Sequence, residues 1–485
     1  MANNKAKPFL LIEILESFSE RDLEKLTRFV ASTYFNTDKY AVKLLEVLKE
    51  SIINKKRLDD EAQGMIYHRV FSDLSQGKTV LNKKQKATFN AKMNVLTRLA
   101  EKFLTVEALN ENDISDVLLN NKLLEKKLFR LLERRIRRNR QQTTAIKDAN
   151  HYIHKYQMET NVLNYLHHKG VLDKQDNLPE LNLNLDVYYV LNKLNLHTTA
   201  LSLMDVYASK EYDFADMKAI KVLLDLPQYS GHPLIQLHLA IIDLLTHKAH
   251  TDYSKLLEMI EGHKAVIPTD DLHAAYVVAT NFCAEQITLG NLDYYRYHFE
   301  LYRIMDNNNL LLEENTITPG KLKNMVSVSC RTDEFGWAIQ MIHKYCPFLK
   351  KGLRDNIYNF NLGKIAFYQK DYQEAIDYLY RIDNIDLDHD INRRMIMIKS
   401  YYELENEYKE TTAQVFRSAE KYIQECKSLT FKKRKAYKNF IRILINLYRI
   451  RHRASKMDIE TIKKKLENVV YISDKNWLLE KIDEF

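Results

Sequence analysis

Two pairs of histidines have a spacing that puts both rings on one face of a helix, where they could share a metal ion. His151 and His154 lie three residues apart, and so do His247 and His250. A zinc site needs further ligands, and helical catalytic sites carry H-E-x-x-H or a related acidic motif. No such motif and no nearby pair of cysteines accompanies these histidines. We expect them on polar surface or at capped core positions, and we predict no metal and no other cofactor.

Three aspartates copy the beginning of a calcium-binding loop. Asp386, Asp388 and Asp390 give the pattern D-x-D-x-D. The next position of such a loop is glycine and its twelfth is glutamate, whereas this chain has Ile391 and Met397 there. The aspartates are therefore predicted to form a turn between helical repeats.

The sequence gives no support for a catalytic nucleophile or a phosphate-binding loop. Cys283 and Cys330 lie among apolar residues, where a free cysteine is usually a small buried hydrophobe. The two closest glycines are Gly352 and Gly363. That spacing excludes G-x-G-x-x-G, the Walker loop and the G-x-S-x-G nucleophile elbow, all of which need closer glycines. The protein is predicted not to be an enzyme.

The elements that carry these residues are predicted to be helices throughout. The 485 residues include 10 Gly and 7 Pro, against about 34 and about 24 at average usage. Apolar residues recur at spacings of three and four in long segments such as 83–109, which is the pattern of a helix that buries one stripe. No segment alternates apolar and polar residues as a half-buried strand would. The predicted fold class is all-α.

One segment resembles the tetratricopeptide repeat, a helix–turn–helix unit. Residues 361–382 place Leu362 and Gly363 at the Leu-Gly of that motif and Ala375 at its small position. Small residues there let the two helices of a hairpin approach closely. The segment departs from the motif at Asn359, Ala366, Ile382 and Leu387, which replace its Trp, Tyr, Ala and Pro.

The pattern recurs on both sides of this segment. Residues 321–345 align at an offset of 37, with Ala338 on Ala375, and residues 394–423 align at an offset of 36, with Thr411 on Ala375. The resemblance implies an antiparallel helix-hairpin solenoid, tetratricopeptide-like, over about 318–425. Tyr34-Phe35-Asn36 and the segment 477–481 are also similar to a group of uncharacterised bacterial all-helical proteins, and this second resemblance implies the fold but no activity.

Three regions follow from these patterns. We predict an N-terminal helical region with a basic helix over 1–170, degenerate helical hairpins over 171–317, and tetratricopeptide-like hairpins with C-terminal helices over 318–485. Residues 1–9 precede no long apolar stretch, and the longest uncharged run, 226–242, contains two prolines and two histidines. We therefore expect a cytoplasmic protein with no signal peptide and no membrane partner.

The net charge of +8 is concentrated in two stretches. Residues 122–147 carry ten Lys/Arg and two Glu, and residues 427–456 carry eleven Lys/Arg and no acid. In the first stretch we expect Lys127, Arg130, Arg134 and Arg138 on one helix face and Leu124, Leu128, Leu131, Leu132 and Ile136 on the other. In the second we expect Lys435, Lys438 and Arg442 outside and Phe440 and Leu444 inside.

Two functions fit these features. The first is a non-enzymatic interaction scaffold that binds a peptide or partner protein on a helical-repeat surface. Its candidate contact residues are the aromatic ones of the first hairpin helices, namely Tyr358, Phe360, Tyr368, Tyr401 and Tyr402. The alternative is a nucleic-acid-binding or regulatory protein that uses the basic stretches 122–147 and 427–456. Those stretches could equally solvate the surface or meet acidic protein segments.

Overall fold

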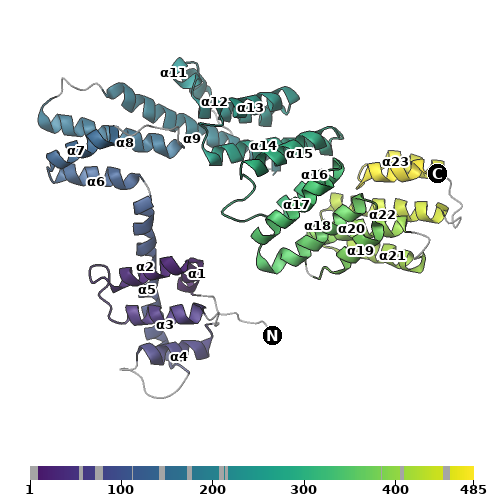
Figure 1. The fold of residues 1–485 in the computed structure, drawn as a ribbon, viewed down its shortest axis with the longest axis horizontal. Coiled ribbons are helices and arrows are strands. Elements are labelled where there is room, and N and C mark those ends of the chain that lie inside the picture. Colours follow the sequence, from purple (N-terminus) through teal and green to yellow (C-terminus); the bar gives the residue numbers. More distant parts are fainter. Residues whose placement is uncertain are drawn as a thin grey trace. The chain divides into compact units, whose positions relative to one another are not determined.

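The computed structural model describes residues 9–53, 58–71, 80–111, 113–140, 148–171, 177–206, 212, 217–383, 385–404, 409–451 and 459–485 (Figure 1). Within these ranges the regular secondary structure is helical and there is no strand. The one extended feature is an isolated bridge between Glu313 and Thr316. The prediction of an all-α fold is confirmed for the part of the chain that the structure describes.

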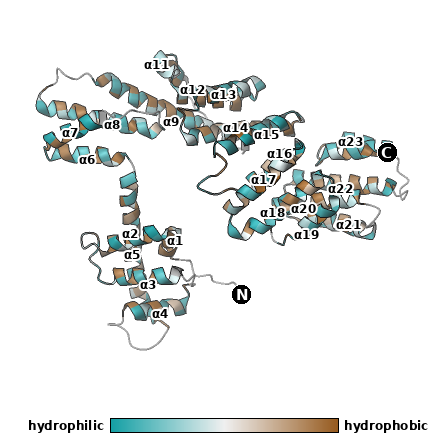
Figure 2. Ribbon diagram, in the orientation of Figure 1, coloured by the Kyte–Doolittle hydropathy of each residue, from teal (hydrophilic) through white to brown (hydrophobic). Residues whose placement is uncertain are grey.

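Hydrophobic and hydrophilic residues are mixed within the individual helices (Figure 2). Each helix can therefore bury one stripe and leave the other in water. Among the described helices, none combines the length and the apolar character needed to cross a bilayer.

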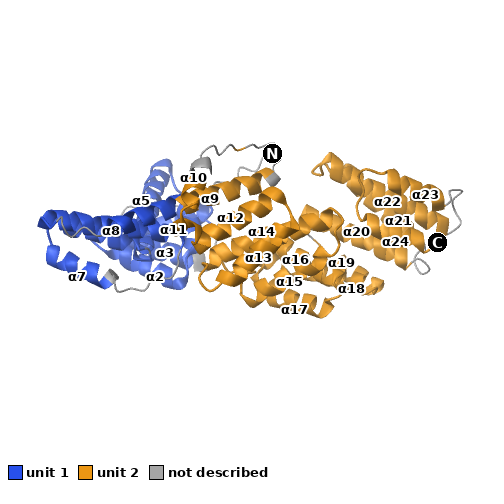
Figure 3. Cartoon of the chain, turned by 90° about the horizontal axis from the view of Figure 1, so that it is seen from above, with its two compact units in different colours: residues 1–189 blue, residues 190–485 orange. Residues whose placement is uncertain are grey.

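The chain divides into two compact units, residues 1–189 and 190–485 (Figure 3). The division falls inside one helix, α9 (Leu178–Val206). A boundary predicted at 170 precedes this division, and a boundary predicted between 317 and 318 lies within the second unit.

The first unit contains a core built by its first five helices, in which Leu26, Leu44 and Phe89 are fully buried. Ser19 and Asp22 form a reciprocal capping box before α2, as S/T-x-x-D/E patterns do. A smaller cluster around Leu132 and Tyr165 joins the next three helices. The helices before α9 are α1 (Leu10–Ser17), α2 (Glu20–Ala31), α3 (Ala41–Ile53), α4 (Asp60–Val70), α5 (Lys83–Glu111), α6 (Ile114–Glu125), α7 (Phe129–Arg140) and α8 (Ala149–Lys169).

The second unit is a succession of helices in which neighbours along the chain pack on one another, for example α12 with α13 and α14 with α15. Helix α18 packs on its partner α19 and also on α16 and α20. The helices are α10 (Met217–Leu224), α11 (Pro227–Ser230), α12 (Pro233–His247), α13 (His250–His263), α14 (Thr269–Thr288), α15 (Tyr294–Asn307), α16 (Pro319–Arg331), α17 (Phe335–Tyr345), α18 (Arg354–Tyr368), α19 (Tyr372–Tyr380), α20 (Leu387–Glu403), α21 (Lys409–Glu425), α22 (Phe431–Arg451), α23 (Ile459–Asn468) and α24 (Lys475–Asp483).

Helices α18 and α19 approach each other most tightly at Gly363. A Cβ added to Gly363 would lie 2.9 Å from Cγ of Leu379 and 3.1 Å from the carbonyl oxygen of Ala375. Ala375 and Leu379 are themselves fully buried. The expectation of a close approach is confirmed at Gly363, where an added Cβ has no room, and Ala375 lies buried against it.

The spacing of buried small residues corrects one detail of the sequence alignment. Ala338, Ala375 and Thr412 are each fully buried, on α17, α19 and α21. Thr411, which the sequence alignment matched to Ala375, is only half-buried. Burial therefore favours an interval of 37 residues for this step, the same as that from Ala338 to Ala375. Gly363 and Ser400 are also 37 residues apart, and both are buried.

Replacing Gly363 with alanine should destabilise the second unit by about 1–3 kcal/mol, because the new methyl group overpacks a contact that includes backbone. Helix propensity alone would favour alanine by about 1 kcal/mol, so a loss of stability identifies the close approach. Urea denaturation measures the change. Gly336→Ala on α17 is the control, since nothing lies within 4 Å of its added Cβ. A Gly363→Ala variant as stable as that control would contradict the packing described above.

Candidate functional site

Most of the predicted aromatic contact residues are part of the core. Phe360 and Tyr402 are fully buried and Tyr401 nearly so, because their rings fill the space between successive helices. Tyr402 packs edge-on against Trp477 of α24, and the Tyr401 hydroxyl lies 2.9 Å from that of Tyr380. These three residues cannot offer a free binding surface, so that part of the prediction is wrong.

The other two aromatic candidates, Tyr358 and Tyr368, remain half-buried at the surface of α18. Tyr358 lies beside the His343 ring, with 5.7 Å between the ring centroids. Tyr368 lies beneath the guanidinium of Arg331, 5.0 Å from its ring centroid. Tyr368 therefore has a cation against its ring at the surface, whereas the cations beside Phe360 and Tyr402 lie against buried rings.

The first basic stretch is not one continuous helix. Helix α6 ends at Glu125 and α7 begins at Phe129, and Lys127 between them has a φ of 55°. A left-handed residue of this kind ends a helix, so Lys127 does not share a helix face with the next three arginines. Arg130, Arg134 and Arg138 are exposed on α7.

The apolar face expected opposite these arginines is also only partly present. Leu124 and Leu132 are buried and Ile136 packs against them, whereas Leu128 is 50% exposed and Leu131 48% exposed. Leu128 lies in the break between α6 and α7, whereas Leu131 lies within α7. Residues 141–147 of this stretch lie outside the described residues.

The second basic stretch follows the expected pattern on α22. Phe440 and Leu444 are fully buried, Lys435 and Arg442 are exposed, and Lys438 is half-buried. Arg442 forms an exposed ion pair of 3.4 Å with Glu420 of α21. Residues 452–456 lie outside the described residues. The two basic stretches belong to different units.

The histidines and aspartates considered as metal ligands mostly form contacts with neighbouring residues. His247 lies 3.2 Å from Asp252 and His250 lies 2.9 Å from the Tyr294 hydroxyl, so each contacts a different residue. Asp386 caps the start of α20 by accepting hydrogen bonds from the backbone of Asp388 and His389, whereas Asp388 and Asp390 lie within that helix. The predicted turn therefore includes only Asp386. Within the described residues, no group of three or more His, Cys, Asp or Glu could hold a metal ion.

The two cysteines considered as nucleophiles have raised thiol pKa values. Cys283 and Cys330 are buried, and burial raises the pKa of each thiol to about 12. The reactive form of cysteine is the thiolate, so both side chains stay protonated near neutral pH.

The structure gathers four cationic side chains that the sequence did not single out. Lys323 and Arg331 come from α16, Lys364 from α18 and Lys399 from α20. We call these four residues the cationic cluster. The Lys364 ammonium donates to the Ser327 hydroxyl, which lies between the two cations of α16. Asp474, the residue before α24, lies 2.9 Å from the Lys399 ammonium.

Helical spacing and the 37-residue offset explain how these residues meet. Lys323, Ser327 and Arg331 follow one another at intervals of four, which puts them on one face of α16. Lys364 and Tyr368 repeat that interval on α18. Ser327 contacts Lys364 and Arg331 contacts Tyr368, and both pairs are 37 residues apart. The constant offset was the sequence signal that could have identified the cluster.

Two of the four cations have carboxylate partners. Lys323 donates to Asp388 and Lys399 to Asp474. Lys364 has the Ser327 hydroxyl and, at 5.9 Å, the Phe360 ring, and Arg331 has the rings of Tyr295 and Tyr368. Within the described part of the chain, neither Lys364 nor Arg331 forms an ion pair. The cluster therefore has an excess of two positive charges.

The pKa values of residues in the cluster reflect this excess of positive charge. Burial, with the nearby charges of Lys323 and Lys399, lowers the pKa of Lys364 to about 8. The Lys399 ammonium lowers the pKa of Asp474 against the opposing effect of burial, and Arg331 and Lys364 add to the lowering. Asp474 precedes α24 with φ 46° and ψ 43°, and its side chain does not cap that helix. Its carboxylate turns to Lys399 instead.

This arrangement can hold an anion. An ammonium and a guanidinium without carboxylate partners are the groups that recognise carboxylates and phosphates. Comparison with protein-family models, with curated proteins and with solved structures finds no match for this chain.

Lys364→Met should raise the free energy of unfolding by roughly 1–3 kcal/mol at pH 7, because the charged ammonium is disfavoured in the folded state. The folded pKa of about 8 is below the ordinary value of 10.5. The penalty is therefore fully present below pH 8 and disappears as the pH rises to about 10.5, so wild-type stability should rise across that interval. Denaturation at pH 7, 9 and 10.5 measures both effects. A methionine variant less stable than the wild type at pH 7 would show that Lys364 is a stabilising residue.

Proposed function

We propose that the protein is a non-enzymatic scaffold that binds an acidic segment of a partner protein at the cationic cluster. The surface belongs to a tetratricopeptide-like array of hairpins over about residues 318–425. The buried residues Ala338, Ala375 and Thr412 support this array, because equivalent positions of stacked repeats recur at a constant interval. All four cysteines are free, which supports a location in the reducing cytoplasm.

The observation that carries the proposal is the position of Lys364. Its ammonium lies near two other cations, and no carboxylate of the described residues lies within ion-pair distance of it. These surroundings lower the pKa of Lys364 to about 8. Such a residue lowers the stability of the fold, and residues that do so are concentrated where function requires them. A bound carboxylate would supply the missing counter-charge.

The neighbouring groups favour a carboxylate-bearing peptide as the ligand. Arg331 is held against Tyr368, which fixes its planar fork for bidentate pairing with a carboxylate. Tyr368 adds apolar area beside the charge. Asp474 already shows that this surface accepts a carboxylate, since it pairs with Lys399 within the same chain.

The test is direct binding of a hexaglutamate peptide, with hexaglutamine as the uncharged probe, measured by calorimetry at low salt. The wild type should bind hexaglutamate and not hexaglutamine, because the site recognises charge. Combining Lys364→Met with Arg331→Gln should weaken hexaglutamate binding by at least about tenfold, as expected for losing charge-assisted hydrogen bonds.

A matched control removes the same charges from the second helix of a hairpin. Lys421→Met with Arg417→Gln changes two exposed residues of α21, and its binding should equal that of the wild type. Equal affinity of the two double variants, or no binding of hexaglutamate by the wild type, would contradict the proposed site.

A further inference from the structure

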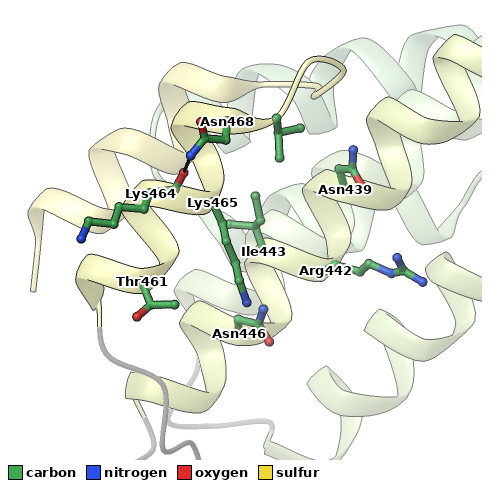
Figure 4. Close-up of a pocket in the computed structure, with 9 residues that line it drawn as sticks. Asn439, Arg442, Ile443, Asn446, Thr461, Lys464, Lys465 and Asn468 are labelled. Atoms are coloured by element: carbon green, nitrogen blue, oxygen red, sulfur yellow. Dashed lines mark hydrogen bonds between the residues drawn. The ribbon is translucent and has the colours of Figure 1, made fainter.

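A second cationic feature of this unit is a groove between α22 and α23. Its volume is about 500 Å³. Three cations and three amides line most of it, namely Arg442, Lys464, Lys465, Asn439, Asn446 and Asn468 (Figure 4). Among the described residues that line the groove there is no aspartate or glutamate. Of the three cations, only Arg442 belongs to the candidate basic surface predicted from the sequence. The two lysines come from α23, which lies outside the basic stretch 427–456.

The three cations are spread across the two helices instead of converging on one point. Lys465 extends from α23 toward Asn446 of α22, whereas Lys464 and Arg442 extend to opposite sides (Figure 4). A single small anion could not contact all three. A chain of regularly spaced negative charges could contact them in succession, which is how basic grooves follow a nucleic-acid backbone.

The remaining lining groups are suited to phosphates and not to bases. Asn468 donates to the Lys464 carbonyl oxygen over 2.8 Å and Asn439 to the Tyr471 carbonyl oxygen over 2.9 Å, so two of the amides are held in place. No aromatic residue lines the groove, and base stacking therefore has no platform there. The ion pair of Arg442 with Glu420 is exposed, and an exposed pair of this kind is weak enough for a phosphate to replace it.

We infer that the groove between α22 and α23 binds the phosphate backbone of single-stranded nucleic acid without sequence preference. The contacts run through Arg442, Lys464 and Lys465. This site is separate from the cationic cluster and does not depend on the function proposed for it. Its ligand differs as well, because the cluster presents Lys364 and Arg331 to one acidic segment and the groove presents a row of charges.

The experiment measures the binding of fluorescein-labelled 20-nucleotide oligo(dT) by anisotropy between 50 and 200 mM salt. Replacing Arg442, Lys464 and Lys465 with glutamine should weaken binding at least about tenfold. It should also reduce the slope of log affinity against log salt by about 2, since each single-strand phosphate contact contributes about 0.7. Circular dichroism checks the fold, and Lys464→Gln alone, at an exposed position, should give a smaller loss in the same direction.

The matched control replaces Arg130, Arg134 and Arg138 of α7 with glutamine, which removes the same charge from the first unit. Its affinity for oligo(dT) should stay within about twofold of the wild type.

The inference is overturned if the two triple variants lose equal affinity, if the groove variant binds as well as the wild type, or if the wild type does not bind oligo(dT) at 50 mM salt. It is also overturned if hexaglutamate displaces the oligonucleotide as effectively as unlabelled oligo(dT) does. A Lys364→Met, Arg331→Gln variant that still binds oligo(dT) would separate this site from the cationic cluster.

Discussion

The close contact between α18 and α19 at Gly363 is the constraint on which the hairpin region depends. The missing side chain of Gly363 is what allows the Ala375 carbonyl and the Leu379 side chain to approach its backbone. Leu379 belongs to the same continuous core as Phe360 and Phe440, so a wider separation of the two helices would open that core. A crossing of this kind tolerates no added volume, because protein interiors are packed at crystal density.

An interval of 37 residues also separates two pairs of residues that meet between α16 and α18. Ser327 reaches Lys364, and Arg331 reaches Tyr368, each across an interval of 37 residues. The cationic cluster is therefore a consequence of how the hairpins pack. It combines stabilising pairs, such as Lys399 with Asp474, with an ammonium that the fold disfavours. Groups that reduce stability are expected at a binding site, since a ligand supplies the interactions that the empty site lacks.

The two cationic features of the second unit differ in geometry, and this difference is the reason that different ligands are proposed for them. In the cluster, Lys364 of α18 lies beside the Phe360 ring and Arg331 of α16 lies beside the Tyr368 ring, an arrangement that suits the short acidic segment proposed as its ligand. In the groove, Lys464, Lys465 and Arg442 are distributed along two helices (Figure 4), which suits a regular polyanion. The net charge of the chain, +8, does not distinguish the cluster from the groove.

The sequence by itself determined the fold class and the tight hairpin contact. The scarcity of glycine and proline and the three-and-four spacing of apolar residues are local properties, and helices follow from local spacing. Gly363 and Ala375 were recognisable because a close helix crossing restricts residue size. The buried stripe of α22, with Phe440 and Leu444, could be predicted for the same reason.

Only the tertiary structure decided which residues gather and which are buried. Tyrosine suits both surfaces and cores, so residue type alone does not place Tyr401 and Tyr402. Tyr402 of α20 is buried because it packs edge-on against Trp477 of α24. Lys127 ended a helix because its backbone is left-handed, a choice that charge periodicity does not reveal. Asp474 is 75 residues from Lys399, and no local pattern could bring them together. Long-range contacts of this kind depend on how many helices pack at once, and that information is not contained in any short segment.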